Sequence, residues 1–378
     1  MEKVMSRKLI TISTIMTLMS TSVIADVPNV AADIAPIHSL VSRVMDGVGA
    51  PKLIVQSGAS PHGYRLRPSE AKALQDADHV FWIGEELTPW LNSAIDTLAT
   101  KASVTTLLDQ EGVVLHNFRE GALFEAHDHS AHDDDDKDHD DHDDHDDDKD
   151  HKDHDDHDDH DDDKDHKDHD DHDDHDDDKD HDDHDDHDDD KDHDDHDDHN
   201  DHDDHDDHGS HDPHAWLSPE NAKLWLNIIA SKLSVSDPEN AATYFMNAAA
   251  GQAEIEEMIA EVSATLKPVQ GGKFVVFHDA YQYFENDFDF YASGAISLSD
   301  ASDPSPARIE KIQKRIRDEG IQCVLAEPQF KKGLVATVME GSEATASVID
   351  PLGAELKTGP KLYTQLIKNM AKALRDCL

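Results

Sequence analysis

The stretch DPENAATYFMNAAAGQAEIEEMIAEVSATLKP, residues 237–268, decides the fold. It is an unusually long helical pattern: Asp237 and Pro238 suit the start of a helix, and Pro268 suits its end. At about 1.5 Å per residue, about 30 residues extend roughly 45 Å, long enough to run the height of the molecule. We therefore predict a rigid connecting helix at 237–267, with a separate lobe on either side.

Strand-like and helical segments alternate on both sides of this helix. Before it, we expect strands at 30–34, 52–55, 79–83 and 104–108, and helices at 37–48, from Pro68, from Pro89 and at 218–233. After it, we expect strands at 274–277, 294–298, 322–326 and 346–349, and helices at 280–284, 306–319, from Lys332 and at 360–377. Such alternation forms parallel sheets with covered faces. The sequence predicts an α/β fold of two (β/α)4 lobes, formed by 26–126 with 212–236 and by 268–378.

A tract of His and Asp, residues 127–211, interrupts the N-terminal lobe. Residues 127–208 contain 49 Asp, 7 Lys and 23 His, so they carry -42 of the formal net charge of -53. The rest of the chain, at -11, is mildly acidic and has no basic stripe, which argues against nucleic acid and anionic membranes as partners. Because the tract offers almost nothing to bury and repels itself, we predict a disordered loop.

The histidines of the tract are regularly spaced. From His139 onward, every His falls on one phase of a His-Asp-Asp repeat whose register continues to His211 and His214. Imidazoles among carboxylates form transient sites for Zn²⁺, and the carboxylates favour the charged imidazole, so protons compete with the metal. We predict an auxiliary, low-affinity zinc collector. The alternative is an acidic loop that only improves solubility.

The N-terminus has the pattern of a signal peptide, predicted at 1–25. Lys3, Arg7 and Lys8 precede the apolar run 9–19, which is too short to span a bilayer, and a small residue stands at Ala25. We therefore expect export to the periplasm without direct membrane insertion. A buried N-terminal helix is the alternative.

The chain has two cysteines, Cys323 and Cys377. In an exported protein, such a pair is most simply a disulfide, here from a predicted strand to the end of the last helix. Two buried thiols are the alternative.

Three histidines outside the tract stand at or just beyond strand ends or before a helix. They are His62, His214 and His278, and the carboxylate of Asp350 stands at a fourth strand end. Open α/β sheets place their ligands at such ends, and three imidazoles with one carboxylate suit tetrahedral Zn²⁺. Each residue has a structural alternative: a loop histidine often only donates hydrogen bonds, and Asp350 before Pro351 can shape a turn. We interpret His38 and His79 as structural.

Five separated motifs carry a family resemblance. The chain resembles the zinc-binding solute-binding proteins of periplasmic high-affinity zinc ABC transporters, in GASPHGYRLRPSE (58–70), HAWLSPENA (214–222), FHDAYQYF (277–284), CVLAEPQF (323–330) and DPLGAEL (350–356). The resemblance spans nearly the whole mature chain. It implies two (β/α)4 lobes bridged by a long helix, with zinc as the transported ligand in the cleft between them, and delivery to a membrane permease. We expect the chain to be a monomer.

The resemblance also implies the ligand set. The matching positions are His62, His214 and His278, and Asp350 matches a fourth ligand that some relatives replace by a neighbouring carboxylate or water. This chain departs from many zinc members in having Pro61 where they have Glu, which puts more weight on Asp350 or water. Manganese-binding relatives usually carry Glu at the position of His278, so the third imidazole favours zinc.

Two alternative functions remain in view. A manganese-binding protein of the same fold is one, and a zinc-dependent hydrolase is the other. The chain has no HExxH motif, and the nearest candidate bases are Asp279 and the more distant Glu327. We therefore expect a binding protein and not an enzyme.

Overall fold

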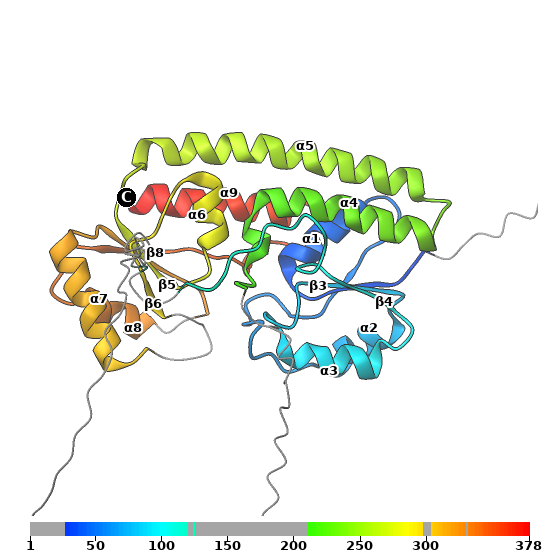
Figure 1. The fold of residues 1–378 in the computed structure, drawn as a ribbon, viewed down its shortest axis with the longest axis horizontal. Coiled ribbons are helices and arrows are strands. Elements are labelled where there is room, and N and C mark those ends of the chain that lie inside the picture. Colours follow the sequence, from blue (N-terminus) through cyan, green and yellow to red (C-terminus); the bar gives the residue numbers. More distant parts are fainter. Residues whose placement is uncertain (1–26, 120–123, 125–210, 298–303, 330–331) are drawn as a thin grey trace, which may run out of the picture. The chain divides into compact units, whose positions relative to one another are not determined.

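The computed structural model describes residues 27–119, 124, 211–297, 304–329 and 332–378 (Figure 1). The predicted signal peptide and the His/Asp tract up to Ser210 lie outside the described residues. All described residues belong to one compact unit of the chain.

The N-terminal lobe is a parallel sheet with helices between its strands. Its strands have the order β2-β1-β3-β4, and every neighbouring pair is parallel. The elements are β1 (Val30–Ala32), α1 (Ala35–Val44), β2 (Lys52–Leu53), α2 (Pro68–Asp76), β3 (His79–Trp82), α3 (Pro89–Leu98), β4 (Ser103–Thr106), the short 3-10 helix η1 (Ala215–Leu217) and α4 (Pro219–Ser236). Helices α2 and α3 cover one face and α1 and α4 the other (Figure 1).

The C-terminal lobe repeats this plan in the order β6-β5-β7-β8, again all parallel. Its elements are β5 (Phe274–His278), α6 (Gln282–Phe288), β6 (Ala295–Ser297), α7 (Pro306–Glu319), β7 (Cys323–Ala326), α8 (Lys332–Met339), β8 (Thr345–Val348) and α9 (Leu362–Cys377). The two predicted α/β lobes are therefore confirmed, with strand ends displaced by one or two residues.

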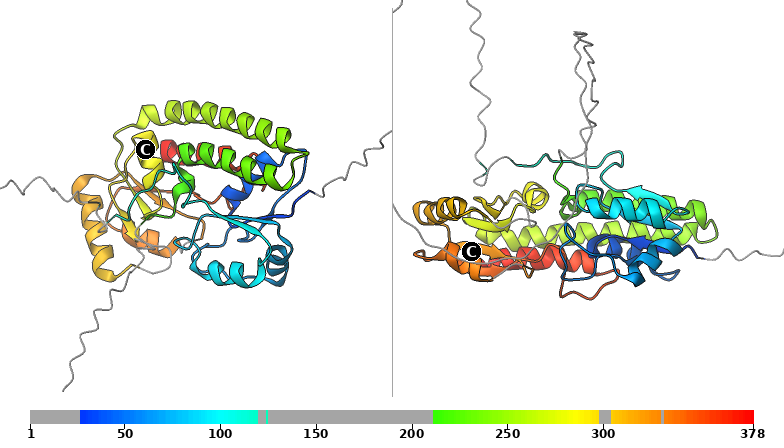
Figure 2. Two further views of the ribbon diagram at one scale, coloured as in Figure 1. Left: turned by 45° about the vertical axis from the view of Figure 1, so that its right-hand side comes forward. Right: turned by 90° about the horizontal axis from the view of Figure 1, so that it is seen from below.

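The connecting helix, α5 (Ala241–Leu266), packs against α1 and α4 of the first lobe and against α9 of the second (Figure 2). It buries one stripe of side chains, among them Tyr244, Ile255 and Val262. At Gly251 a Cβ atom would lie 3.0 Å from Leu226 Cδ1, so glycine permits the close approach of α4. The stripe fixes both lobes on one rigid element.

The start of this helix differs from the prediction. Asp237 does not cap it but ends α4, and helix α5 begins at Ala241. The buried carboxylate of Asp237 accepts hydrogen bonds from the side chains of Asn240 and Tyr244, at 2.7 and 2.8 Å, and so stabilises the turn between the helices. A good N-cap residue is also a good turn residue, and tertiary contacts decide between the two.

A disulfide joins Cys323 in β7 to Cys377 at the end of α9, as predicted. It closes the last helix onto the sheet of the C-terminal lobe. Within the ranges described above, no helix combines the length and apolar character needed to cross a bilayer.

Candidate metal centre

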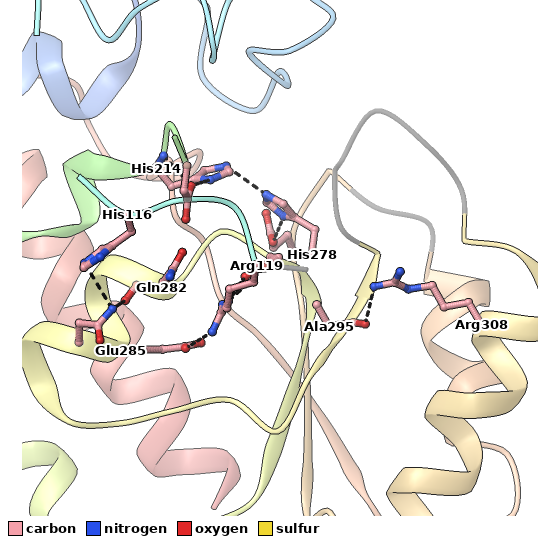
Figure 3. Close-up of polar contacts among 12 residues, drawn as sticks. His116, Arg119, His214, His278, Gln282, Glu285, Ala295 and Arg308 are labelled. Carbon is pink, nitrogen blue, oxygen red and sulfur yellow. Dashed lines mark hydrogen bonds and ion pairs between the residues drawn. The ribbon is translucent and has the colours of Figure 1, made fainter. Parts of the chain in front are cut away.

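His214 and His278 face one another across the join between the lobes (Figure 3). His214 immediately precedes η1, and His278 is the last residue of β5. Their Nε2 atoms are 3.3 Å apart, and both side chains are buried. Two ligand nitrogens at a Zn–N distance of about 2.0–2.1 Å and a tetrahedral angle lie about 3.3–3.4 Å apart. The pair therefore has the spacing of two neighbouring ligands of one zinc ion.

A carboxylate holds the far side of each ring. Asp212 Oδ1 lies 2.6 Å from His214 Nδ1, and Glu327 Oε1 lies 2.6 Å from His278 Nδ1. Each ring therefore directs its Nδ1 to a buried carboxyl group, and the two Nε2 atoms face one another in the pocket at hydrogen-bond distance. This carboxylate–histidine arrangement is typical of metal ligands, because it fixes the ring and makes it more basic.

The surroundings of the pair are strongly acidic and shielded from water. Burial raises the pKa of Asp212 to about 7, against the opposing effects of the His214 backbone amide and of Arg119. Burial likewise raises the pKa of Asp279, next to His278, and that of Glu285 to about 7, while Arg119 opposes both shifts. Buried carboxylates of this kind lower the cost of placing a cation between the two rings.

His62 approaches from the N-terminal lobe, on the loop between β2 and α2. Its ring centroid lies 5.7 Å from that of His214, at an angle of 56°. The loop is held by a hydrogen bond of 2.7 Å from Trp90 Nε1 to the carbonyl oxygen of Pro61. All three imidazoles line one small cavity of about 10 Å³. The other residues that line it are Pro61, Trp216, Glu327, Gln329, Pro351 and Leu352. A cavity of this size is close to the roughly 10–15 Å³ that one water-sized sphere occupies.

The three rings line the same cavity, but they do not surround a common metal position. No three His, Cys, Asp or Glu side chains in the described parts of the chain are arranged so that they could hold a metal ion. The ring centroids of His214 and His278 are 5.1 Å apart, whereas those of His62 and His214 are 5.7 Å apart, and the His62 side chain is partly exposed.

Asp350 follows β8 and contacts its own turn. Its Oδ1 accepts hydrogen bonds from the amides of Leu352 and Gly353, at 3.0 and 2.8 Å, and its Oδ2 accepts one of 2.6 Å from Ala354. A carboxylate has about four lone-pair sites, so three of them are engaged here. The structure does not place Asp350 among the residues that line the cavity of the three histidines.

Sequence reasoning missed Asp212 and considered Glu327 only as a distant candidate base, although Glu327 contacts His278 directly. Asp212 stands two residues before His214, and Glu327 directly follows β7, the strand beside β5. The strand order would have identified Glu327, since the ends of neighbouring parallel strands lie side by side. Asp279, considered as a base, instead forms an ion pair with Arg119. His38 and His79 lie in the N-terminal lobe, where they contact Pro51 and Ser236.

The chain matches the family model described as zinc-uptake complex component A, periplasmic, over residues 30–377. The high-affinity zinc uptake system protein ZnuA of Brucella abortus (strain 2308) is 45% identical over 349 residues, covering 92% of this chain and 91% of that protein. The protein of the same name from Paracoccus denitrificans (strain Pd 1222) is 41% identical over 355 residues, covering 94% and 93%. A crystal structure of ZnuA has a TM-score of 0.61 at 17% identity, covering 92% of this chain and all (100%) of that one, and shows the same fold.

Proposed function

The chain belongs to the family of periplasmic zinc-uptake components, and we propose that it captures Zn²⁺ with His62, His214 and His278 as ligands. The family match and the named relatives confirm the resemblance found in the sequence, and with it a periplasmic zinc-binding protein of a high-affinity zinc uptake system. Zinc is the transported ligand and not a catalytic cofactor.

One observation carries the assignment of ligands. The Nε2 atoms of His214 and His278 are 3.3 Å apart, and each ring is oriented by a buried carboxylate. The two rings thus have the spacing of two of the four ligands of a tetrahedral site. Zinc entering the pocket draws His62 inward, and Asp350 or a water molecule takes the fourth position.

The contacts of the chain disfavour the two alternatives. Three imidazoles suit zinc better than Mn²⁺, which prefers oxygen ligands. A zinc hydrolase needs a base beside its metal-bound water. Asp279 is engaged by Arg119 and Glu327 by His278 Nδ1, so neither is poised for that role. We therefore propose a binding protein without catalytic activity.

The partner that receives the metal is the permease of a zinc ABC transporter. Helix α5 bridges both lobes, so capture orders loops around the metal more than it closes the lobes on a hinge. We propose that the His/Asp tract, residues 127–211, provides weak zinc sites in addition to this single tight one. We propose that the mature chain works as a monomer in the periplasm.

Competition titration against zinc chelators, with metal analysis, tests this assignment. The intact protein is expected to hold one tight zinc and several weak ones, and a His62→Ala, His214→Ala, His278→Ala triple variant is expected to lose the tight one. A His38→Gln, His79→Gln variant serves as the control, because these buried histidines lie outside the pocket. Deletion of 127–208 is expected to remove the weak equivalents alone. A triple variant that keeps tight zinc would refute the ligand assignment.

A further inference from the structure

Two chain segments near the ends of the His/Asp tract, 116–119 and 211–212, lie together and are here called the neck. Asn117 and His211 form an antiparallel bridge, and the amide of Asp212 donates a hydrogen bond of 2.7 Å to the His116 carbonyl. The segments 116–119 and 211–212 therefore lie side by side. Two residues beyond Asp212 stands His214, so the neck also carries one of the proposed zinc ligands.

Helix α6 holds both segments of the neck through one buried phenol. Tyr283 Oη accepts a hydrogen bond of 3.1 Å from the His116 amide and donates one of 2.8 Å to the Asp212 carbonyl. The His116 ring also packs on the Tyr283 ring, with centroids 4.7 Å apart. Because α6 follows β5 directly, this contact joins the segment of His214 to the segment of His278.

Arg119 makes the second connection from the neck (Figure 3). Its Nε lies 3.0 Å from Asp279 Oδ1, its Nη2 also bonds Asp279, and its Nη1 lies 2.5 Å from Glu285 Oε2. The side chain is 16% exposed, the two carboxylates 7% and 1%. The Phe124 ring lies 3.6 Å from the guanidinium carbon and covers one face of it. A planar fork between two buried carboxylates fixes position as well as charge.

We propose that Arg119 is a positioning residue for metal capture: it fastens the neck to α6 and thereby keeps His214 and His278 at ligand spacing. The chain of contacts is short, since Asp279 adjoins His278 and the neck leads to His214. A pair held in place beforehand loses less conformational freedom when it binds metal. The proposal rests on the ligand set given under the proposed function.

The sign of the effect separates positioning from charge. Removing a positive charge near a cation site would tighten zinc binding if Arg119 acted only by electrostatics. Loss of a fastening contact would weaken it. Arg119→Lys keeps the charge but loses the planar fork, so positioning predicts weaker binding for lysine too, and electrostatics predicts no change.

The test is chelator competition for the first zinc equivalent of the full chain. We expect about 10-fold weaker binding for Arg119→Gln, in the range of other outer partners of metal ligands, and an intermediate value for Arg119→Lys. Arg43→Gln is the matched control, because Arg43 is similarly buried and forks onto Glu254, in α5 and outside the pocket. The absorption spectra of Co²⁺ bound to the variants are expected to remain those of a tetrahedral site, but saturation is expected at a higher Co²⁺ concentration.

Unchanged or tighter zinc binding by Arg119→Gln would overturn the proposal. If that variant fails to fold, Tyr283→Phe keeps the ring and removes both neck hydrogen bonds, and we expect several-fold weaker zinc. If folded Tyr283→Phe and Arg119→Lys both bind zinc as tightly as the parent protein, the proposal is overturned. His278→Ala, titrated in parallel, separates the two proposals. If it leaves tight binding intact, the ligand set fails, and if it alone weakens binding, only the positioning role fails.

Discussion

The two sheets share one strand order, yet the corresponding strand ends do different work. In the N-terminal lobe, β1 and β3 are neighbours, and Asp33 directly after β1 accepts a hydrogen bond of 2.7 Å from the amide of Ile83, directly after β3. In the C-terminal lobe, β5 and β7 are neighbours. There His278 ends β5 and bonds Glu327 directly after β7, at 2.6 Å. Both lobes thus join the same two strand ends through a polar side chain.

The difference lies in where the polar group is directed. Both carboxylate oxygens of Asp33 accept hydrogen bonds from backbone amides, those of Ile34 and Ile83. Burial raises the pKa of Asp33 to about 7. His278 uses one nitrogen for Glu327 and directs the other to His214. Topology therefore brings polar groups to both pairs of strand ends, but only His278 has a second polar atom directed into the pocket, where it is available to the proposed zinc ligand set.

The largest expected effect comes from His278, the strand-end residue that faces the pocket. His278→Ala is expected to weaken zinc binding about 1,000-fold, roughly 4 kcal/mol, because a lost ligand costs more than the roughly 10–100-fold of an outer partner. Chelator competition measures this change. His79→Ala, a buried histidine in β3, is expected to leave zinc binding unchanged. Equal losses in the two variants would erase the distinction between the lobes.

We expect the disulfide to affect the stability of the C-terminal lobe and not its zinc affinity. The Cys323→Ala, Cys377→Ala double variant is expected to lose about 3 kcal/mol of unfolding free energy, since the bridge closes a long loop with a sequence separation of 54. Denaturant unfolding under oxidising conditions measures this loss. Zinc affinity of the folded variant should stay within about twofold of the parent, and a larger loss would mean that the bridge also shapes the pocket.

Asp33→Ala tests the inward-facing side. The variant leaves two backbone amides without their acceptor, which costs about 1–3 kcal/mol each, but it also removes a buried carboxylate. We expect a net loss of about 2 kcal/mol in unfolding free energy and no change in zinc affinity. Thermal unfolding and chelator competition, run on the same preparation, give both numbers. Weaker zinc binding with intact stability would contradict the comparison.

Glu327→Gln weakens the support behind the outward-facing histidine. Glutamine can accept from His278 Nδ1 but carries no charge, so zinc affinity is expected to fall about 10-fold or somewhat more. Asp212→Asn should behave alike, because Asp212 holds His214 in the same way. Glu254→Gln, an exposed carboxylate of α5, is the control. Unaltered affinity in both pocket variants would remove the role assigned to these carboxylates.

The alternation of strands and helices predicted the lobes, because hydrophobic period and turn residues are local features. The helix start at Ala241 was missed, since Asp237 suits a cap and a turn equally well. Strand-end position indicated His62, His214 and His278, yet the same rule gave no sign that Asp350 binds three amides of its own turn. The roles of Arg119 and Tyr283 could not be predicted, because the Arg119–Asp279 and His116–Tyr283 contacts join residues 160 and 167 positions apart.

The smallest expected effect concerns the N-terminal half of the site. Trp90→Phe keeps an aromatic ring but removes the hydrogen bond to Pro61, so the His62 loop is less well placed to complete the set. One hydrogen bond of about 0.5–1.5 kcal/mol corresponds to a loss of about 2–10-fold in zinc affinity. Trp225→Phe is the matched control, because its indole also donates to a backbone carbonyl, that of Leu107, but in the core of the lobe. That control should lose stability and keep its zinc affinity. If Trp90→Phe keeps the zinc affinity of the parent protein and Trp225→Phe loses it, the His62 loop does not contribute to zinc binding in this way.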